Sequence, residues 1–302
     1  MNPRVTAISG EQFNRISRVQ LAAAGVNESA IKRHIASGRL TITDHGVVAI
    51  SPVLTHDPWG RWMSATLTEP GTWLSQLAAS VAWKLLLWEG PHVTVTRVGS
   101  GGPRRHGNLI VHRSRTLEGD VTTLDGIPIT TVPRTLIDIA GATTPRRFVH
   151  PVSDKALARA VRESVRLEHV TLPELGSALG RYRGCRGIRR LAAAIASYSG
   201  LPLERARSGA EVVALQVLRA AGHPMPRLNV DVAGEEADLS WPKFKLIVEI
   251  DGDPFHQDVG EDARKEKAWR EAGWLVRRVP SDDVYERPHL LLAHAPAPNV
   301  PE

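Results

Sequence analysis

Three carboxylates stand close together in the last third of the chain, where the surrounding residues are apolar. Glu249 and Asp251 end the run 246–251, which is typical of a buried strand, and Asp238 closes the short strand before it. Burying a carboxylate without a partner costs several kcal/mol. Residues two apart on a strand point to the same face, so Glu249 and Asp251 are expected to share one. A hard divalent cation is the usual partner of such a group. The alternative is an exposed strand end with solvated acids.

The residues that follow this cluster carry a family resemblance. The sequence Asp-Gly-Asp-Pro-Phe-His at 251–256 resembles the Asp-Gly-x-x-Trp-His block of very short patch repair endonucleases. The stretch 261–277 resembles the helix and strand that come next in a related domain family with the restriction-endonuclease-like fold of PD-(D/E)XK nucleases. The resemblance covers about residues 207–285 and implies a DNA endonuclease domain.

The resemblance also implies roles for four residues. Asp238 and Glu249 would be the acidic pair that holds Mg²⁺ or Mn²⁺ for hydrolysis of a DNA phosphodiester. Asp251 would assist the site or orient the attacking water. His256 would act on that water or stabilise the phosphate. The expected chemistry is therefore metal-dependent cleavage of DNA.

Asp251 stands where the wider superfamily has a lysine. In the general pattern that lysine stabilises charge developing on the phosphate or orients the attacking water. Lys245, four residues before Glu249, or Lys265, on the following helix, could supply the cation instead. The remaining alternative is a nuclease fold that has lost its activity.

Glu211 is a further candidate metal ligand. Ser208 and Glu211 open an amphipathic helix and match a capping box. A glutamate on this first helix often completes the metal site in the superfamily that the domain resembles. Capping and metal binding fit the sequence equally well.

Composition is that of a multi-domain protein. A chain of 302 residues is long enough for two or three domains, each with its own core. The single cysteine, Cys185, excludes a disulfide framework and a multi-cysteine zinc site. The sequence shows no signal peptide and no apolar run long enough to span a bilayer. We therefore expect a cytoplasmic protein with no membrane partner.

Charge is distributed unevenly along the chain. Residues 1–153 and 154–208 each carry a net charge of +6, whereas residues 209–302 carry −6. A basic first part suits contact with nucleic acid. An acidic last part suits a metal site, because a cation offsets some of that excess.

The first fifty residues follow the order helix, turn, helix and hairpin, which is typical of a winged helix-turn-helix. Ser17 and Asn27 are expected helix caps, and Gly46 supplies the positive φ of a tight hairpin turn. The helix expected over 27–37 has an outward face with three candidate DNA contacts: Ser29, Lys32 and Arg33. The alternative is a small packing module that touches no DNA.

The same part of the chain carries a second resemblance. Val-Gln-Leu-Ala-Ala-Ala-Gly-Val at 19–26 and Asp-Gly-Ile-Pro-Ile-Thr-Thr-Val-Pro-Arg-Thr-Leu-Ile-Asp at 125–138 look like segments of AbiEi-type antitoxins. The likeness covers residues 4–141. These antitoxins belong to type IV toxin–antitoxin systems and repress their own operons. The resemblance therefore implies a DNA-binding regulator with a cognate toxin as partner, and no catalytic set is evident in this stretch.

A helical segment follows, ending in an arginine-rich run. Leu157, Val161 and Val165 recur at helical spacing. The run 181–190 holds three candidate contacts to a phosphate backbone: Arg181, Arg183 and Arg186. The alternative is a solvated run that caps a helix.

The sequence therefore predicts a multi-domain protein of mixed α+β and α/β class. Its expected parts are a winged helix-turn-helix, a small α+β middle domain, a basic helical connector, a restriction-endonuclease-like domain and a disordered tail, at 1–52, 53–150, 151–206, 207–290 and 291–302. We expect the last domain to hold one mixed sheet with Glu249 on an interior strand. The predicted function is a DNA-interacting protein with a Mg²⁺-dependent endonuclease domain. The alternative is a non-catalytic, antitoxin-like transcriptional regulator with a degenerate nuclease fold.

Overall fold

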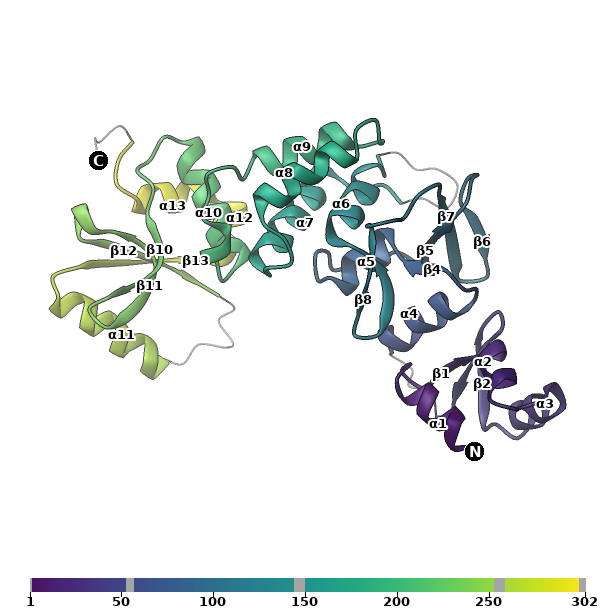
Figure 1. Cartoon of the computed structure of the whole chain (residues 1–302). Coiled ribbons are helices and arrows are strands. Elements are labelled where there is room, and N and C mark those ends of the chain that lie inside the picture. Colours follow the sequence, from purple (N-terminus) through teal and green to yellow (C-terminus); the bar gives the residue numbers. More distant parts are fainter. Residues whose placement is uncertain (1, 53–56, 144–149, 253–258, 299–302) are drawn as a thin grey trace. The chain divides into compact units, whose positions relative to one another are not determined.

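A computed structural model describes residues 2–52, 57–143, 150–252 and 259–298 (Figure 1). The chain divides into two compact units. The first contains residues 1–164 and 170–195, and the second contains residues 165–169 and 196–302. Most of the helical segment expected as a separate connector therefore belongs to the first unit. No helix in the described ranges is both long and apolar enough to cross a membrane.

The first unit begins with a small module of three helices and a three-stranded sheet. Its elements are α1 (Pro3–Gly10), β1 (Arg15–Ser17), α2 (Arg18–Ala23), α3 (Glu28–Ala36), β2 (Leu40–Asp44) and β3 (Val47–Ile50), with strand order β1-β3-β2. Ser17 forms a capping box with Gln20, and the Asn27 side chain caps α3. Gly46 has a φ of 71° between β2 and β3. The predicted caps and hairpin turn are confirmed.

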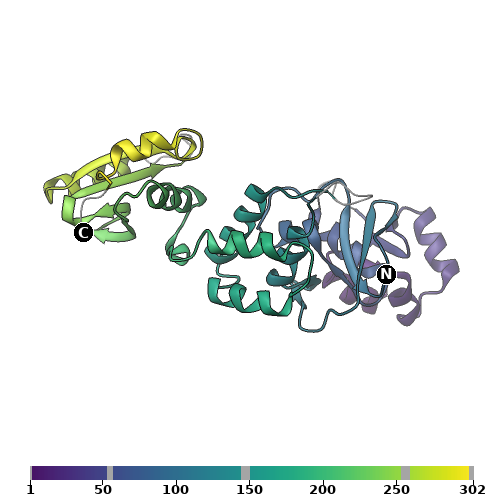
Figure 2. The same cartoon turned by 90° about the horizontal axis from the view of Figure 1, so that it is seen from above.

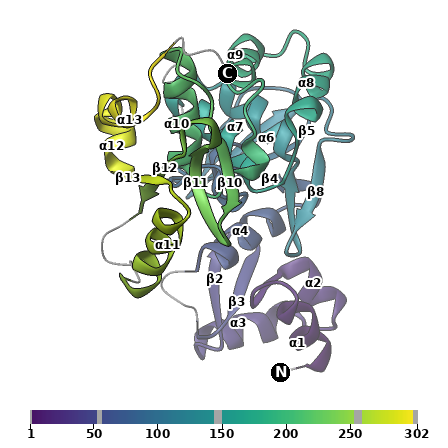
Figure 3. The same cartoon turned by 90° about the vertical axis from the view of Figure 1, so that its left-hand side faces the viewer.

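A six-stranded mixed sheet forms the centre of the first unit. Its strands are β4 (Thr72–Leu74), β5 (Val93–Val98), β6 (Arg104–His106), β7 (Leu109–Ser114), β8 (Val121–Leu124) and β9 (Ile127–Thr130). The helices of this part are α4 (Pro58–Leu67), α5 (Gln76–Ala82) and α6 (Val132–Ala140). The strand order is β6-β7-β5-β4-β9-β8. Figures 1 and 3 show α4 between the amino-terminal module and this sheet. Phe13 stacks on Trp59 of α4 with ring centroids 5.6 Å apart, so α4 joins the two parts.

Three further helices, drawn in teal and green, lie side by side in Figures 1 and 2. They are α7 (Asp154–Arg166), α8 (Leu172–Arg181) and α9 (Ile188–Ala196). Leu157, Val161 and Val165 are buried, as their spacing predicts. The helical prediction for this segment is confirmed.

A charged network ties the end of α8 to the middle sheet. The Tyr182 hydroxyl donates a hydrogen bond to Asp120 at 2.9 Å. The Arg134 guanidinium donates to Asp120 at 3.2 Å and to Asp138 at 3.0 Å. These acids therefore each have a charged or hydroxyl partner inside the unit.

The second unit contains one mixed four-stranded sheet. Its elements are η1 (Leu203–Arg205), α10 (Gly209–Ala220), β10 (Arg227–Val232), β11 (Glu235–Trp241), η2 (Pro242–Phe244), β12 (Leu246–Asp251), α11 (Val259–Glu271), β13 (Leu275–Pro280), α12 (Ser281–Glu286) and α13 (Pro288–His294). The order is β10-β11-β12-β13, antiparallel except for the parallel pair β12–β13. Figure 1 shows α11 on one face and α10, α12 and α13 on the other. Glu249 is on β12, an interior strand, as predicted.

The predicted disordered tail begins too early. Residues 291–294 complete α13, and Leu291 is fully buried. The carbonyl of Pro296 lies 2.7 Å from Nδ1 of His223, so the chain is held beyond the helix as well. The apolar residues 290–292 have a helical face to bury, which outweighs the alanine- and proline-rich composition that follows them.

Candidate functional site

Asp238 and Glu249 lie side by side where the ladder between β11 and β12 ends. Regular pairing runs from Trp241–Leu246 to Leu239–Val248, and Asp238 and Glu249 follow in register. The Asp238 N–H donates to Glu249 Oε1 at 3.0 Å, and the Ile250 N–H donates to Asp238 Oδ2 at 2.8 Å. Each carboxylate thus binds the backbone of the opposite strand. The structure brings together the two acids that the sequence singled out.

Burial and mutual repulsion make this pair hard to ionise. Burial and, after it, repulsion by the neighbouring Asp238 carboxylate raise the pKa of Glu249 to about 8. Burial likewise raises the pKa of Asp238 to about 6, with a contribution from Glu211. Backbone N–H groups, Lys265 and, for Glu249, Arg278 act in the opposite direction. The side chains around the pair do not offset its negative charge, and an added cation would.

Glu211 lies at the start of α10 and also near Asp238. It is buried in the first turn of α10, and its N–H donates to the Ser208 hydroxyl at 3.2 Å. Its Oε2 accepts from the Arg207 N–H at 2.9 Å and from Asn229 Nδ2 at 2.6 Å. The Ser208 half of the predicted capping box is present, whereas the Glu211 carboxylate binds the N–H of Arg207, one residue before the cap, and lies close enough to Asp238 to raise its pKa.

Asn229 is a residue that the sequence did not indicate. It interrupts β10 with a φ of 47°, at the place opposite Asp238 between the pairs Leu228–Leu239 and Val230–Ala237. Its Nδ2 donates to the carbonyl of Arg205 at 2.7 Å as well as to Glu211. Asparagine tolerates positive φ better than most residues, but strand periodicity contains no signal for it.

Asp251 has an arginine partner. Arg278 Nη1 donates to Asp251 Oδ1 at 2.8 Å and lies 3.6 Å from Asp262 Oδ2. Arg278 is also paired in register with Glu249 across the parallel strands β12 and β13. The acids around Arg278 raise the pKa of its guanidinium despite its partial burial. Two arginines, Arg277 and Arg278, stand within the otherwise apolar strand β13, but which acid Arg278 meets depends on the register.

The two candidate lysines lie in different places. Lys245 precedes β12 with a φ of 49°, and its Nζ lies 5.2 Å from the centroid of the Trp274 ring. Its predicted place on the strand face of Glu249 is wrong, because the left-handed backbone turns it away from the strand. Lys265 of α11 lowers the pKa of both Asp238 and Glu249. It also pairs with Glu261 at 3.5 Å. Lys265 is therefore the lysine that acts on the acidic pair.

The donor set at this site is made of carboxylates, the ligands that Mg²⁺ and Mn²⁺ prefer. Within the described ranges, no three His, Cys, Asp or Glu side chains are grouped as metal ligands, and Asp238 and Glu249 each bind a backbone N–H. Their shared negative charge fits a cation in this position. His256 lies outside the described residues.

Neither a family model nor a curated protein gives a significant match to this chain. Site geometry is therefore what bears on function.

The outward face of α3 is as predicted. Ser29, Lys32 and Arg33 are all exposed, whereas Ile31 is buried in the core of the module. Asn27 caps the helix and Glu28 lies in its first turn. The three side chains are free to meet a ligand from solvent.

Part of the arginine-rich run holds the first unit together. Arg190 donates to the carbonyls of Ala140 at 2.6 Å and Val152 at 2.7 Å. A Cβ at Gly187 would lie 2.3 Å from the carbonyl carbon of Ala140, so only glycine fits there. Gly187 thus allows α9 to approach the end of α6 closely.

The three arginines singled out in this run differ in their surroundings. Arg181 and Arg183 are exposed, and the Arg181 guanidinium lies 5.8 Å from the centroid of the Tyr182 ring. Arg186 is exposed but donates to the Thr143 hydroxyl at 2.7 Å. Arg181 and Arg183 are therefore the more accessible candidates for a phosphate contact.

Proposed function

We propose that the second unit is a metal-dependent DNA endonuclease domain that hydrolyses phosphodiester bonds. The adjacency of Asp238 and Glu249, whose pKa values are both raised, is the observation that carries the proposal. These two carboxylates would hold Mg²⁺ or Mn²⁺, with Glu211 beside them. The bound cation supplies Lewis-acid activation of the phosphodiester.

The protein's own cations have distinct tasks in this proposal. Lys265 lies near both acids and stabilises negative charge that develops on the phosphate, in place of the superfamily lysine. Arg278 is held by Asp251 at 2.8 Å and keeps positive charge beside Glu249. Asp251 is thus a positioning residue for Arg278. His256 keeps its expected role on the attacking water.

The first unit would deliver the nuclease to DNA. Ser29, Lys32 and Arg33 of α3 would contact DNA as the recognition helix of a winged helix-turn-helix, with their exposure as the supporting observation. Arg181 and Arg183, together with Arg186, would add backbone contacts. Both sets are in the basic part of the chain.

A second candidate function is a non-catalytic, antitoxin-like regulator with a cognate toxin as partner. The backbone hydrogen bonds accepted by Asp238 and Glu249 favour it, because they satisfy one oxygen of each carboxylate without a metal ion. In that case DNA contact by α3 would be the main activity.

Nicking of supercoiled plasmid DNA in the presence of Mg²⁺ or Mn²⁺ separates the two functions. We expect cleavage by the wild-type protein and a loss of roughly a hundredfold or more in Asp238→Asn, the scale on which removing one electrostatic stabiliser acts. Asp231→Asn is the matched control, because Asp231 is an exposed acid in the same unit. No cleavage by the wild type, or equal cleavage by Asp238→Asn, would favour the regulator.

A further inference from the structure

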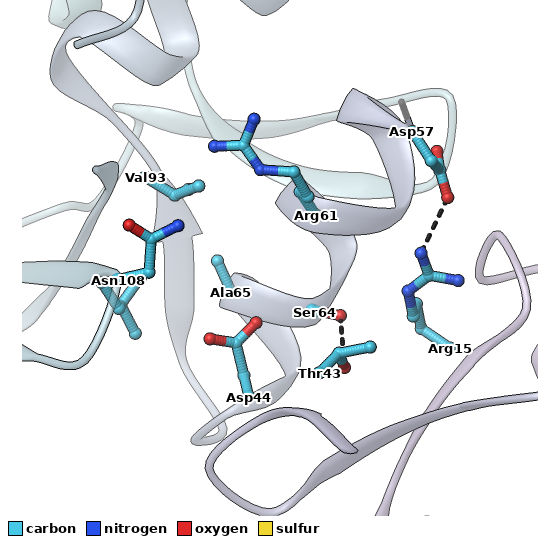
Figure 4. Close-up of a pocket in the computed structure, with 10 residues that line it drawn as sticks. Arg15, Thr43, Asp44, Asp57, Arg61, Ser64, Ala65, Val93 and Asn108 are labelled. Carbon is cyan, nitrogen blue, oxygen red and sulfur yellow. Dashed lines mark hydrogen bonds and ion pairs between the residues drawn. The ribbon is translucent and has the colours of Figure 1, made fainter. Parts of the chain in front are cut away.

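A cavity of about 340 Å³ lies in the first unit where the β2–β3 hairpin meets α4. Figure 4 shows its walls, which come from β1, β2, α4, β5 and the start of β7. Arg15 is buried to 97% and forms one wall, and Thr43 and Ser64 also line the cavity. A cavity of this size, in which a few polar groups converge beside apolar side chains, is a common setting for a small-molecule site.

One side of the cavity is rigid and electrically neutral. Arg15 Nη2 donates to Asp57 Oδ2 at 2.8 Å, and Asp57 Oδ1 accepts from the Gly60 N–H at 2.8 Å (Figure 4). A Cβ at Gly60 would lie 2.0 Å from Asp57 Oδ2, so glycine is required for this pair. Thr43 and Ser64 share a hydrogen bond of 2.9 Å. The charges of Arg15 and Asp57 therefore cancel.

The other side carries polar groups with unused capacity. Among the described residues, the Asp44 carboxylate and the Asn108 amide have no hydrogen-bond partner, and Arg61 uses only Nη2, which pairs with Glu89 at 3.0 Å. In Figure 4, Asp44, Asn108 and Arg61 lie apart from the Arg15–Asp57 pair, with Val93 next to Asn108. Burial raises the pKa of Asp44 to about 6, although Arg61 and Arg15 lower it. The Asp44 carboxylate is therefore partly removed from water without accepting a hydrogen bond from the protein.

The remaining charges select the ligand class. One carboxylate, Asp44, and one guanidinium, Arg61, face the same space, so a doubly charged anion such as a phosphate monoester would meet Asp44 unfavourably. A molecule with one positive and one negative group suits both. Val93, Ala65 and Leu109 supply an apolar surface for the rest of such a molecule.

We propose that this cavity binds a small zwitterion with the chemistry of a free amino acid. Its ammonium group donates to Asp44, its carboxylate accepts from Arg61, and Asn108 bonds to either group. The hydrophobic part of the ligand lies on Val93 and Leu109.

Occupation of the cavity would also affect the hairpin. Thr43 and Asp44 end β2, directly before the turn that contains Gly46. A ligand between Asp44 and Arg61 ties this hairpin to α4. Any effect of the ligand on DNA affinity rests on the proposed function, in which the β2–β3 hairpin is the wing of a winged helix-turn-helix. The binding of a zwitterion does not depend on that function.

Calorimetric titration of the full-length protein with each standard amino acid, without DNA or added metal, tests the proposal. We expect saturable binding of at least one amino acid with one site per chain. Asp44→Asn and Arg61→Gln should each weaken it about tenfold or more, because each removes a charge-assisted hydrogen bond. Asp125→Asn and Arg39→Gln are matched controls at exposed positions of the same unit and should leave binding unchanged.

Absence of binding by every amino acid would overturn the proposal. Unchanged affinity in Asp44→Asn and Arg61→Gln, with melting curves like the wild type, would also overturn it. Asn108 is exposed, so Asn108→Ala should fold like the wild type. This variant should also weaken binding, which separates a loss of ligand contacts from a loss of folding. A failed nicking assay does not bear on these results, because no DNA cleavage is measured.

Discussion

Each unit contains a pair of acidic residues removed from water, and the two pairs differ in how their charge is stabilised. In the first unit, Asp120 and Asp138 both accept hydrogen bonds from the guanidinium of Arg134, and Asp120 accepts another from Tyr182. Burial raises the pKa of Asp138 to about 6, and the attraction of Arg134 opposes this rise. This network is paired within the protein, as expected of a structural element.

The acidic pair of the second unit has no such direct partner among the described side chains. Asp238 and Glu249 accept from backbone N–H groups, and their mutual repulsion adds to the effect of burial. Arg278, the guanidinium nearest in register, donates to Asp251 instead. The contrast teaches that raised pKa values alone do not mark a functional site. A more specific indication of a functional site is a buried acidic pair to which no cationic side chain is directly bound.

The largest expected effect comes from breaking the paired network. Arg134→Met leaves Asp120 and Asp138 buried without their cation, which should lower the free energy of unfolding of the first unit by about 3–5 kcal/mol. Peptide-resolved hydrogen exchange of α6 measures this loss separately from the second unit. Exchange rates in α6 that equal those of the wild type would show that the network is not structural.

A smaller effect, the pH dependence of stability caused by Glu249, is expected in the second unit. The pKa of Glu249 is raised from 4.5 to about 8, so the folded state binds its proton more tightly than the unfolded state. This contribution to stability is fully present below pH 4.5 and is lost as the pH rises to about 8. Without metal, the wild-type unit should lose on the order of 2 kcal/mol between pH 6 and 8.

Glu249→Gln should remove most of this pH dependence, because glutamine does not ionise. Hydrogen exchange of β11 and β12 at pH 6 and pH 8, without divalent metal, measures it. The variant should be more stable than the wild type at pH 8. Parallel pH profiles in the two proteins would contradict the assignment of the raised pKa to Glu249.

Local patterns predicted much of this arrangement. The apolar run before Glu249 predicted an interior strand, and Ser17 and Asn27 were correctly identified as helix caps. Cap residues and strand alternation act through neighbours in sequence, so they can be read without a structure. The pairing of Asp238 with Glu249 was expected from the family resemblance alone, and the antiparallel register of β11 and β12 produces it.

Features that depend on register or on unusual backbone geometry could not be predicted. Arg278 reaches Asp251 because β13 pairs in parallel with β12 in one particular register. Asn229 and Lys245 both have positive φ, which changes the direction of their side chains. Sequence spacing alone placed Lys245 on the strand face and left Asn229 unnoticed. The buried Leu291 was hidden by the tail composition that follows it.

The smallest expected effect concerns the basic face of α3. Reversing both charges in Lys32→Glu/Arg33→Glu should weaken DNA binding about tenfold and reduce the salt slope by roughly two, since each phosphate contact contributes about one. Fluorescence anisotropy at several salt concentrations measures both quantities. Arg4→Glu, an exposed change on α1, is the control. An unchanged slope would move the contact to Arg181, Arg183 and Arg186.

Calorimetric titration with Mn²⁺ and Mg²⁺ tests the central claim most directly. Uncompensated charge at Asp238 and Glu249 predicts saturable binding by the wild type, retained in Asp231→Asn and lost in Asp238→Asn. The loss should occur without unfolding, because neutralising one of two repelling carboxylates does not destabilise the metal-free protein. Absence of metal binding by the wild type, or equal binding by Asp238→Asn, would contradict the account.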